Sequence, residues 1–142
     1  MDYIKTQKEI LTLCLKGKPV VFGRVKDKVV YGSNYHVYIT PEKQVGIDFT
    51  NLRQPIKQST LECIINDKDA DEVYLSPNII AWDKDKLRVF ENGDIKIYVN
   101  EKLLKNFDLL HSTFKGTTPV RAVYIYEDGV MVGFVLPTRY KK

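Results

Sequence analysis

Two apolar runs joined by a tight-turn dipeptide constrain the fold of this chain more than any other feature. Residues 119–126 and 130–137 are rich in β-branched and aromatic side chains, and Asp128-Gly129 lies between them. Asp and Gly tolerate the positive φ that a two-residue hairpin turn requires. The pattern predicts an antiparallel hairpin, and Pro137 should end its second strand because proline cannot donate to a strand ladder.

A short helix is predicted before this hairpin. Asn100 is a good N-cap, because its side-chain carbonyl can accept a hydrogen bond from the first turn. Three apolar side chains then fall on one helical face: Leu103, Leu104 and Phe107. Lys102 and Lys105 lie off that face. We expect the apolar face to pack on the hairpin, against Val123, Ile125, Val132 or Phe134.

The helix, a strand and the apolar hairpin, ending in Leu-Pro-Thr-Arg, resemble the C-terminal end of DNA sliding clamps, the processivity factors of replicative polymerases. The resemblance covers residues 98–139, and it covers the rest of the chain only as a pattern of elements. The matching positions are Asn100, Leu103, Leu104, Pro119, Val120, Leu136, Pro137 and Arg139.

The resemblance implies two helices on one side of curved antiparallel sheets, contributed by two related half-domains. It also implies that the helices face DNA, where basic side chains meet phosphates without reading bases. A clamp ring needs six such domains from two or three chains. A chain with a single domain would therefore have to form a six-membered ring, or would not form a ring.

The first part of the chain predicts a second amphipathic helix, over residues 4–15. Asp2 is a candidate N-cap and Gly17 a candidate C′ residue. The expected apolar face is made of Tyr3, Ile4, Gln7, Ile10, Leu11, Cys14 and Leu15. The opposite face carries Lys5, Lys8, Thr12 and Lys16, with Glu9 beside them.

Strand patterns fill most of the remaining chain. In the first part they lie at residues 19–25, 28–31, 35–40 and 45–49. Residues 50–70 form an irregular linker with a short buried piece at 61–65, and strands resume at 72–75, 78–82, 86–91 and 94–99. The prediction is an α+β, DNA-clamp-like single domain over 1–142, with two helices packed on antiparallel sheets and half-domains of roughly 1–50 and 71–142.

Charge and cysteine content bear on the compartment and the partners. The formal net charge is +4, divided as +5 over residues 1–60, −4 over 61–100 and +3 over 101–142. No apolar run approaches the length of a membrane span, and no signal-peptide pattern opens the chain. Cys14 and Cys63 are the two cysteines, which favours a reducing compartment. We expect a cytoplasmic protein without a membrane partner.

Motifs for catalysis or metal binding are weak. Asp67, Asp69 and Asp71 alternate as in a calcium loop, but Glu72 and Asn78 occupy positions that need glycine and a bidentate glutamate. The two histidines, His36 and His111, have no metal-ligand spacing. Nucleotide-binding and hydrolase motifs are absent from the sequence. We predict no catalytic residue, no metal and no cofactor, and a protein that is not an enzyme.

The lysines of the two predicted helices are the candidate binding residues. If the clamp resemblance holds, they contact the phosphates of duplex DNA without sequence preference: Lys5, Lys8, Lys16, Lys102 and Lys105. A solvated helix face is the simpler interpretation of the same residues. The tyrosines of the strand patterns suit ordinary sheet packing better than a base-stacking platform.

Two functions follow from these patterns. The first is a phage replication accessory protein that contacts duplex DNA. The abundance of Lys, Ile, Asn and Tyr suits an AT-rich bacterial or phage genome. The alternative is a phage or bacterial protein-interaction module that binds a host protein through exposed apolar surface, for example around Trp82 or Phe114. Assembly into a homo-oligomer is an expectation of the first function, and solution mass would separate the two.

Overall fold

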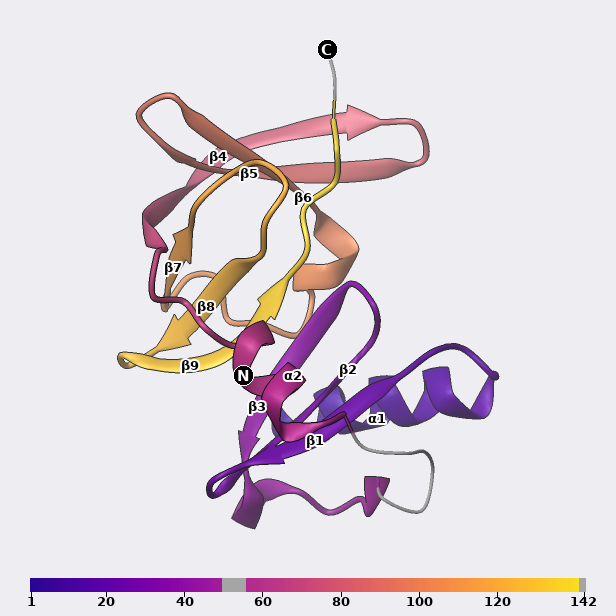
Figure 1. The fold of residues 1–142 in the computed structure, drawn as a ribbon. Helices are drawn as coiled ribbons and strands as arrows, with labels where there is room; N and C mark the ends of the chain where they lie inside the picture. Colours follow the sequence, from indigo (N-terminus) through magenta and orange to yellow (C-terminus); the bar gives the residue numbers. More distant parts are fainter. Residues whose placement is uncertain (50–55, 141–142) are drawn as a thin grey trace. The chain divides into compact units, whose positions relative to one another are not determined.

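The structure is a computed structural model that describes residues 1–49 and 56–140. It has the α+β class that the sequence predicts, with α-helices and antiparallel strands (Figure 1). The chain divides into two compact units, residues 1–66 and residues 67–142.

The first unit is a three-stranded antiparallel meander with two α-helices. Its strands pair in the order β1-β2-β3, with Tyr31 of the central strand opposite both Phe22 and Tyr38. The elements are α1 (Tyr3–Leu15), β1 (Val21–Val25), β2 (Lys28–Gly32), β3 (His36–Pro41), the 3-10 helix η1 (Glu42–Gln44) and α2 (Gln58–Ile64).

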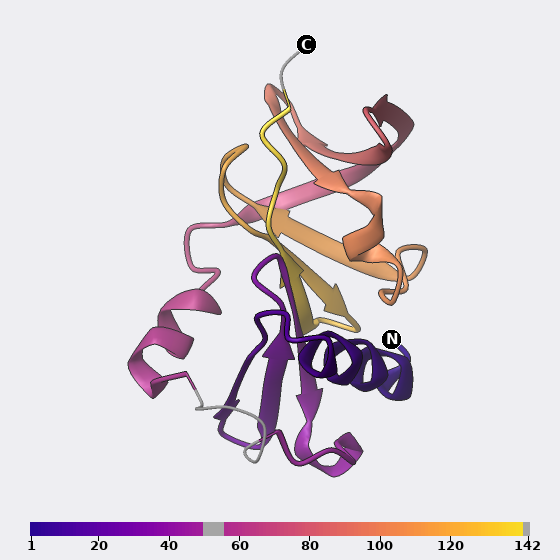
Figure 2. The same cartoon turned by 90° about the vertical axis from the view of Figure 1, so that its right-hand side faces the viewer.

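The two helices of this unit lie on opposite faces of the meander (Figure 2). On one face, the hydroxyl of Tyr31 bonds those of Thr6 in α1, at 2.8 Å, and Thr40 in β3, at 2.7 Å. On the other face, Leu61 of α2 packs so closely on β1 that a Cβ at Gly23 would lie 2.7 Å from its Cδ2. The meander is thus covered on both sides, and its central tyrosine is fully buried.

The second unit is a six-stranded antiparallel sheet. Its strand order is β9-β8-β7-β4-β5-β6. The elements are β4 (Asp71–Trp82), β5 (Asp85–Asn92), β6 (Ile95–Asn100), the 3-10 helix η3 (Glu101–Leu104), β7 (Ser112–Gly116), β8 (Val123–Glu127) and β9 (Val130–Val135). Phe90 of β5 and Phe114 of β7 meet edge to face at 4.8 Å in its core.

The hairpin predicted around Asp128-Gly129 is confirmed. β8 and β9 pair up to Glu127 and Val130, and the two turn residues have φ of 50° and 76°. Both central residues of a type I′ turn need positive φ, which explains this dipeptide. β9 ends at Val135, directly before Leu136 and Pro137.

The caps of the first helix are confirmed, and its buried face agrees with the expected one only in part. Asp2 accepts hydrogen bonds from two backbone N–H groups of the first turn, and Gly17 has a φ of 74°. The buried side chains are those of Thr6, Gln7 and Ile10, whereas Ile4 and Leu15 are exposed. The predicted face is thus confirmed at Gln7 and Ile10 and wrong at Ile4 and Leu15. Thr6, outside that face, is buried because its hydroxyl finds a hydrogen-bond partner in Tyr31.

The predicted helix after Asn100 is a single turn of 3-10 helix. Asn100 caps it as expected, accepting from the N–H of Lys102 at 3.0 Å. Leu104 and Phe107 are buried and Leu103 is half-buried. The turn contacts β5 and β6, the strands next to it in the chain, so the expected packing on the β8–β9 hairpin is not the main contact.

Several strand predictions need correction. Residues 45–49 are not a strand, and the runs 72–75 and 78–82 belong to one strand with a register shift between Leu75 and Ile79. The strand expected between the short helix and the hairpin, for which the sequence predicted no bounds, is β7 (Ser112–Gly116). The predicted linker contains α2, in which Leu61 is buried, and its residues 50–55 lie outside the described part of the chain.

Candidate functional site

The exposed face of α1 carries a row of lysines. Lys5, Lys8, Thr12 and Lys16 are all exposed, and their spacing keeps them on one side of the helix. At 1.5 Å of rise per residue, the row from Lys5 to Lys16 is about 16 Å long. The structure therefore presents the three lysines of the first predicted helix together to solvent.

The acidic residue of this helix points the other way. Glu9 has a side chain only 14% exposed, and its Oε1 lies 3.1 Å from Nε2 of His36 on β3. The hydroxyl of the buried Tyr38 donates a hydrogen bond to the same oxygen. Because Glu9 is held against the sheet, the exposed charges along α1 are those of lysines.

Further hydrogen bonds hold α1 in place. The side-chain amide of Gln7 donates to the carbonyl oxygen of Gln44 at 2.8 Å, and its oxygen accepts from the N–H of Gly46 at 2.8 Å. The amide thus joins the helix to the segment after β3. A helix fixed by buried side-chain bonds presents its outer lysines on a rigid support.

Net charge is concentrated in the unit that carries α1. Residues 1–66 contain ten basic and six acidic side chains, whereas residues 67–142 contain twelve of each. The formal charge of +4 therefore belongs to the first unit. An excess of positive charge around a lysine row attracts a polyanion over a longer distance than the row alone would.

The lysines of the second predicted helix are in a different setting. Lys102 is exposed and its Nζ lies 2.9 Å from Oδ1 of Asp85 on β5. The hydrogen bond from Lys102 lowers the pKa of the Asp85 carboxyl. Lys105 is also exposed, one residue beyond η3. These two lysines belong to a unit with no net charge, and Asp85 offsets the charge of Lys102 locally.

A hydrogen-bonded chain of Ser33, His36 and Glu9 has the composition of a hydrolytic triad. Ser33 Oγ lies 2.6 Å from Nδ1 of His36, opposite the nitrogen that faces Glu9. The same oxygen accepts hydrogen bonds from the N–H groups of Tyr35 and His36, at 3.1 and 3.2 Å. The Ser33 oxygen therefore stabilises the β2–β3 turn. We interpret the hydrogen-bonded side chains of Ser33, His36 and Glu9 as an anchor between α1 and β3.

The strand predicted over residues 35–40 contains His36, but the sequence analysis did not identify the partners of this side chain. The sequence did contain a signal for these partners. Glu9 is the one acidic residue on a helix whose other charged side chains are lysines, and His36 and Tyr38 lie two residues apart on a predicted strand. Residues two apart on a strand share a face. His111, the other histidine, is exposed and its Nδ1 lies 2.9 Å from Oδ2 of Asp108.

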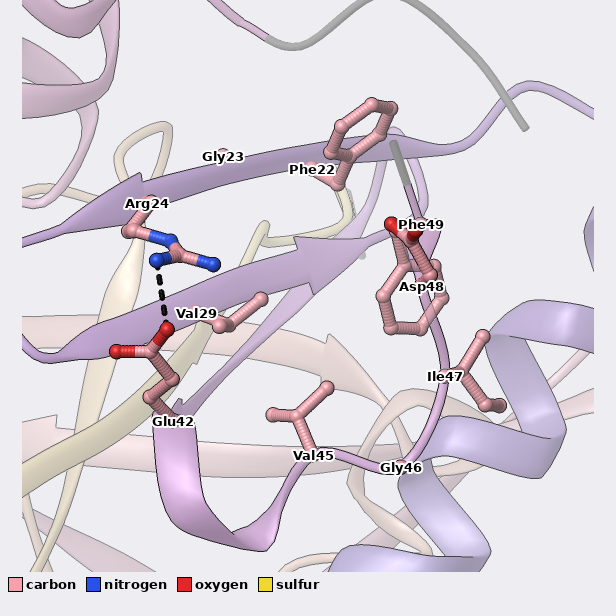
Figure 3. A pocket seen from close by; sticks show the side chains of 10 residues that line it. All are labelled: Phe22, Gly23, Arg24, Val29, Glu42, Val45, Gly46, Ile47, Asp48 and Phe49. Carbon is pink, nitrogen blue, oxygen red and sulfur yellow. Dashed lines mark ion pairs between the residues drawn. The ribbon is translucent and has the colours of Figure 1, made fainter. Parts of the chain in front are cut away.

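A pocket of about 680 Å³ lies in the first unit, between the β1–β2 face and residues 42–49 (Figure 3). Val29 of β2 and Val45 line its floor together with Phe22, Ile47 and Phe49. At its mouth, Nη1 of Arg24 and Oε1 of Glu42 form an ion pair at 2.6 Å. Apolar walls with a polar rim can hold a small apolar group.

The acidic and histidine side chains do not gather into a metal centre in the described residues. Residues 1–49 and 56–140 contain no group of three or more His, Cys, Asp or Glu side chains placed to hold an ion. Asp67, the first member of the alternating acidic cluster, accepts a hydrogen bond from the hydroxyl of Tyr126. In the same part of the chain, no helix is long and apolar enough to cross a membrane.

The apolar surface expected around Trp82 and Phe114 is only partly present. Trp82 is 39% exposed and its ring lies edge-on to that of Tyr140 at 6.2 Å. Phe114 is buried, because its ring packs against Phe90 in the core. The prediction that Phe114 belongs to an exposed apolar surface was therefore wrong.

Comparison of the chain with protein-family models, with curated proteins and with solved structures finds no match. The function must therefore be argued from the geometry above.

Proposed function

We propose that this protein is a non-enzymatic, DNA-clamp-like replication accessory that contacts the phosphates of duplex DNA. The contact surface is the lysine row of α1: Lys5, Lys8 and Lys16. The observation that carries the proposal is the inward orientation of Glu9, at 14% side-chain exposure, which leaves only positive charge on the outer face of the helix.

The chemistry of this face suits backbone contacts. A lysine ammonium is a point charge on a flexible stem, so it neutralises phosphates without the bidentate geometry that reads a base. The row of about 16 Å corresponds to roughly half a turn of B-form DNA, whose pitch is about 34 Å. Binding should therefore be weak for one copy and independent of sequence. Lys102 and Lys105 are secondary contacts in this proposal.

A salt titration of duplex binding tests the proposal. Replacing Lys5, Lys8 and Lys16 together with Gln should flatten the plot of log K against log salt, because fewer counterions are released. The slope should change by about one unit for each phosphate that no longer meets a lysine. The fold should persist, since exposed helix lysines contribute little stability. Circular dichroism of the variant checks this.

A matched control removes the same charge elsewhere. Lys84, Lys86 and Lys96 are exposed lysines of the second unit, and their triple Gln variant should keep the wild-type salt slope. Equal flattening in both triple variants would show that net charge, rather than the α1 face, binds DNA. Lack of duplex binding by the wild type at low salt would rule out the proposal.

The second candidate function is a protein-interaction module. Its specific support is two exposed apolar side chains on α1, those of Ile4 and Leu15. Exposed apolar side chains that lie together mark protein-binding surfaces, whereas scattered ones are ordinary. The same titration separates the functions, because this module requires no affinity for DNA.

A further inference from the structure

One edge of β4 is open along most of the strand. β4 pairs with β7 only over Asp71–Val73, whereas its other edge pairs with β5 at residues 74–75 and 79–82 (Figure 1). In the described part of the chain, the ladder of residues 74–82 is therefore one-sided. An open edge presents backbone N–H and C=O groups that can pair with another strand.

The free end of this edge lacks charge. Its last five residues read Asn-Ile-Ile-Ala-Trp, from Asn78 to Trp82, and Ile79 is 52% exposed. Natural edge strands are usually protected by lysines, prolines or bulges. Here the proline and the register shift lie just before the segment, at Pro77 and between Leu75 and Ile79, so the regular and unprotected part of the open edge is these five residues.

The turn fixes which backbone groups face outwards. Trp82 and Asp85 flank a two-residue turn and are paired, so the N–H and C=O of Trp82 point to β5. Because the direction alternates along an antiparallel ladder, those of Ile80 also point to β5. The N–H and C=O groups of Ile79 and Ala81 therefore point to the open side.

We propose that a second copy of this chain pairs with this edge, antiparallel and about a two-fold axis at Ile80. In this register Ile79 faces Ala81 of the partner subunit, and Ala81 faces Ile79 of the partner subunit. Each of these pairs exchanges two N–H···O=C hydrogen bonds, because both residues direct their backbone groups outwards. Ile80 faces Ile80 of the partner subunit as the non-hydrogen-bonded pair between them.

The composition of the segment favours a second copy over another partner. With the axis at Ile80, Asn78 faces Trp82 of the partner subunit, so no charged side chain opposes a like charge across residues 78–82. The register is thus self-complementary in its hydrogen bonds and free of repulsion. A two-fold contact closes on itself, so it gives a dimer rather than a ring. This inference does not rest on DNA binding.

The first test is the solution mass. Sedimentation velocity over a range of concentrations should give twice the chain mass of 16.5 kDa for the wild type. Ala81→Pro should give the monomer mass, because it removes an outward N–H that β5 does not use. Ala81→Ser keeps this N–H and should remain a dimer. A monomeric wild type, or an Ala81→Pro variant that is folded and dimeric, would overturn the proposal.

The second test fixes the register and does not depend on the proline variant. In a Cys14→Ser, Cys63→Ser background, Ile80→Cys should form an intermolecular disulfide on mild oxidation, because facing non-hydrogen-bonded residues bring their Cβ atoms about 4.5–5.5 Å apart. Ile79→Cys alone should not, because it faces Ala81 of the partner subunit. Cross-linking of Ile79→Cys in preference to Ile80→Cys would overturn the proposed axis.

Discussion

The hydrogen bond from Tyr126 to Asp67 joins a buried strand residue to the acidic segment that opens the second unit. Burial, and then the bond to the Asp67 carboxylate, raise the pKa of Tyr126. Burial also raises the pKa of Tyr31 and of Tyr124. Ionising Tyr126 would place a phenolate against a carboxylate, so the folded state keeps this proton.

A loss of stability at alkaline pH follows from these shifts. Above the ordinary tyrosine pKa of about 10, the unfolded chain releases protons that the folded chain retains, so the free energy of unfolding should fall as pH rises. Urea unfolding between pH 8 and pH 11 measures this. Tyr126→Phe should lose less stability over the interval than the wild type. Equal losses of stability in the wild type and the variant would mean that Tyr126 does not contribute to the pH dependence of unfolding.

At the scale of the element, η3 shows how one turn can hold a core position. Leu104 is only 1% exposed and lies where the turn contacts β5 and β6, whereas Leu110, six residues on, is 86% exposed. The short helix stays in the 3-10 form because it has one turn only, bounded by the cap at Asn100. Its stability therefore depends on the packing of Leu104 and Phe107.

Leu104→Ala should lower the free energy of unfolding by roughly 2–5 kcal/mol, because it removes buried methyl groups and leaves a cavity. Leu110→Ala is the matched control, and as a surface change it should stay within about 0.5 kcal/mol of the wild type. Chemical denaturation of both variants measures the difference. Similar values for the two would show that Leu104 is not a core residue.

At the scale of the whole molecule, charge is divided unequally between the units. The first carries the entire net charge of +4 and the second carries none. Long-range attraction of a polyanion depends on net charge as well as on individual contacts. If the protein binds DNA as proposed, the first unit should therefore make the initial contact.

Photo-cross-linking of backbone-modified duplex DNA should consequently label peptides of residues 1–66, concentrated around α1. Mass spectrometry of the digested complex identifies the sites. Labelling confined to residues 67–142 would contradict this expectation. It would indicate that the DNA contacts are made by Lys102 and Lys105. A duplex of different sequence should give the same map, since lysine contacts to phosphates do not read bases.

Local chemistry was predictable from the sequence by itself. The Asp128-Gly129 turn, the Asp2 and Asn100 caps, the end of the last strand before Pro137 and the α+β class all depend on residues close together in the chain. Positive φ, capping hydrogen bonds and the missing N–H of proline act within a few residues. The sequence also showed that the lysines of α1 share one helical side.

The tertiary structure determined which distant residues these local elements contact. Glu9 turns inwards because His36 and Tyr38, more than twenty-five residues later, offer hydrogen bonds on β3. Thr6, outside the predicted face of α1, is buried because it bonds the hydroxyl of Tyr31, whereas Ile4 and Leu15 are exposed. Phe114 is buried because Phe90 lies across the sheet, and the edge of β4 is open because β7 pairs with only its first residues. These outcomes depend on contacts between distant residues, which periodicity along a sequence does not encode.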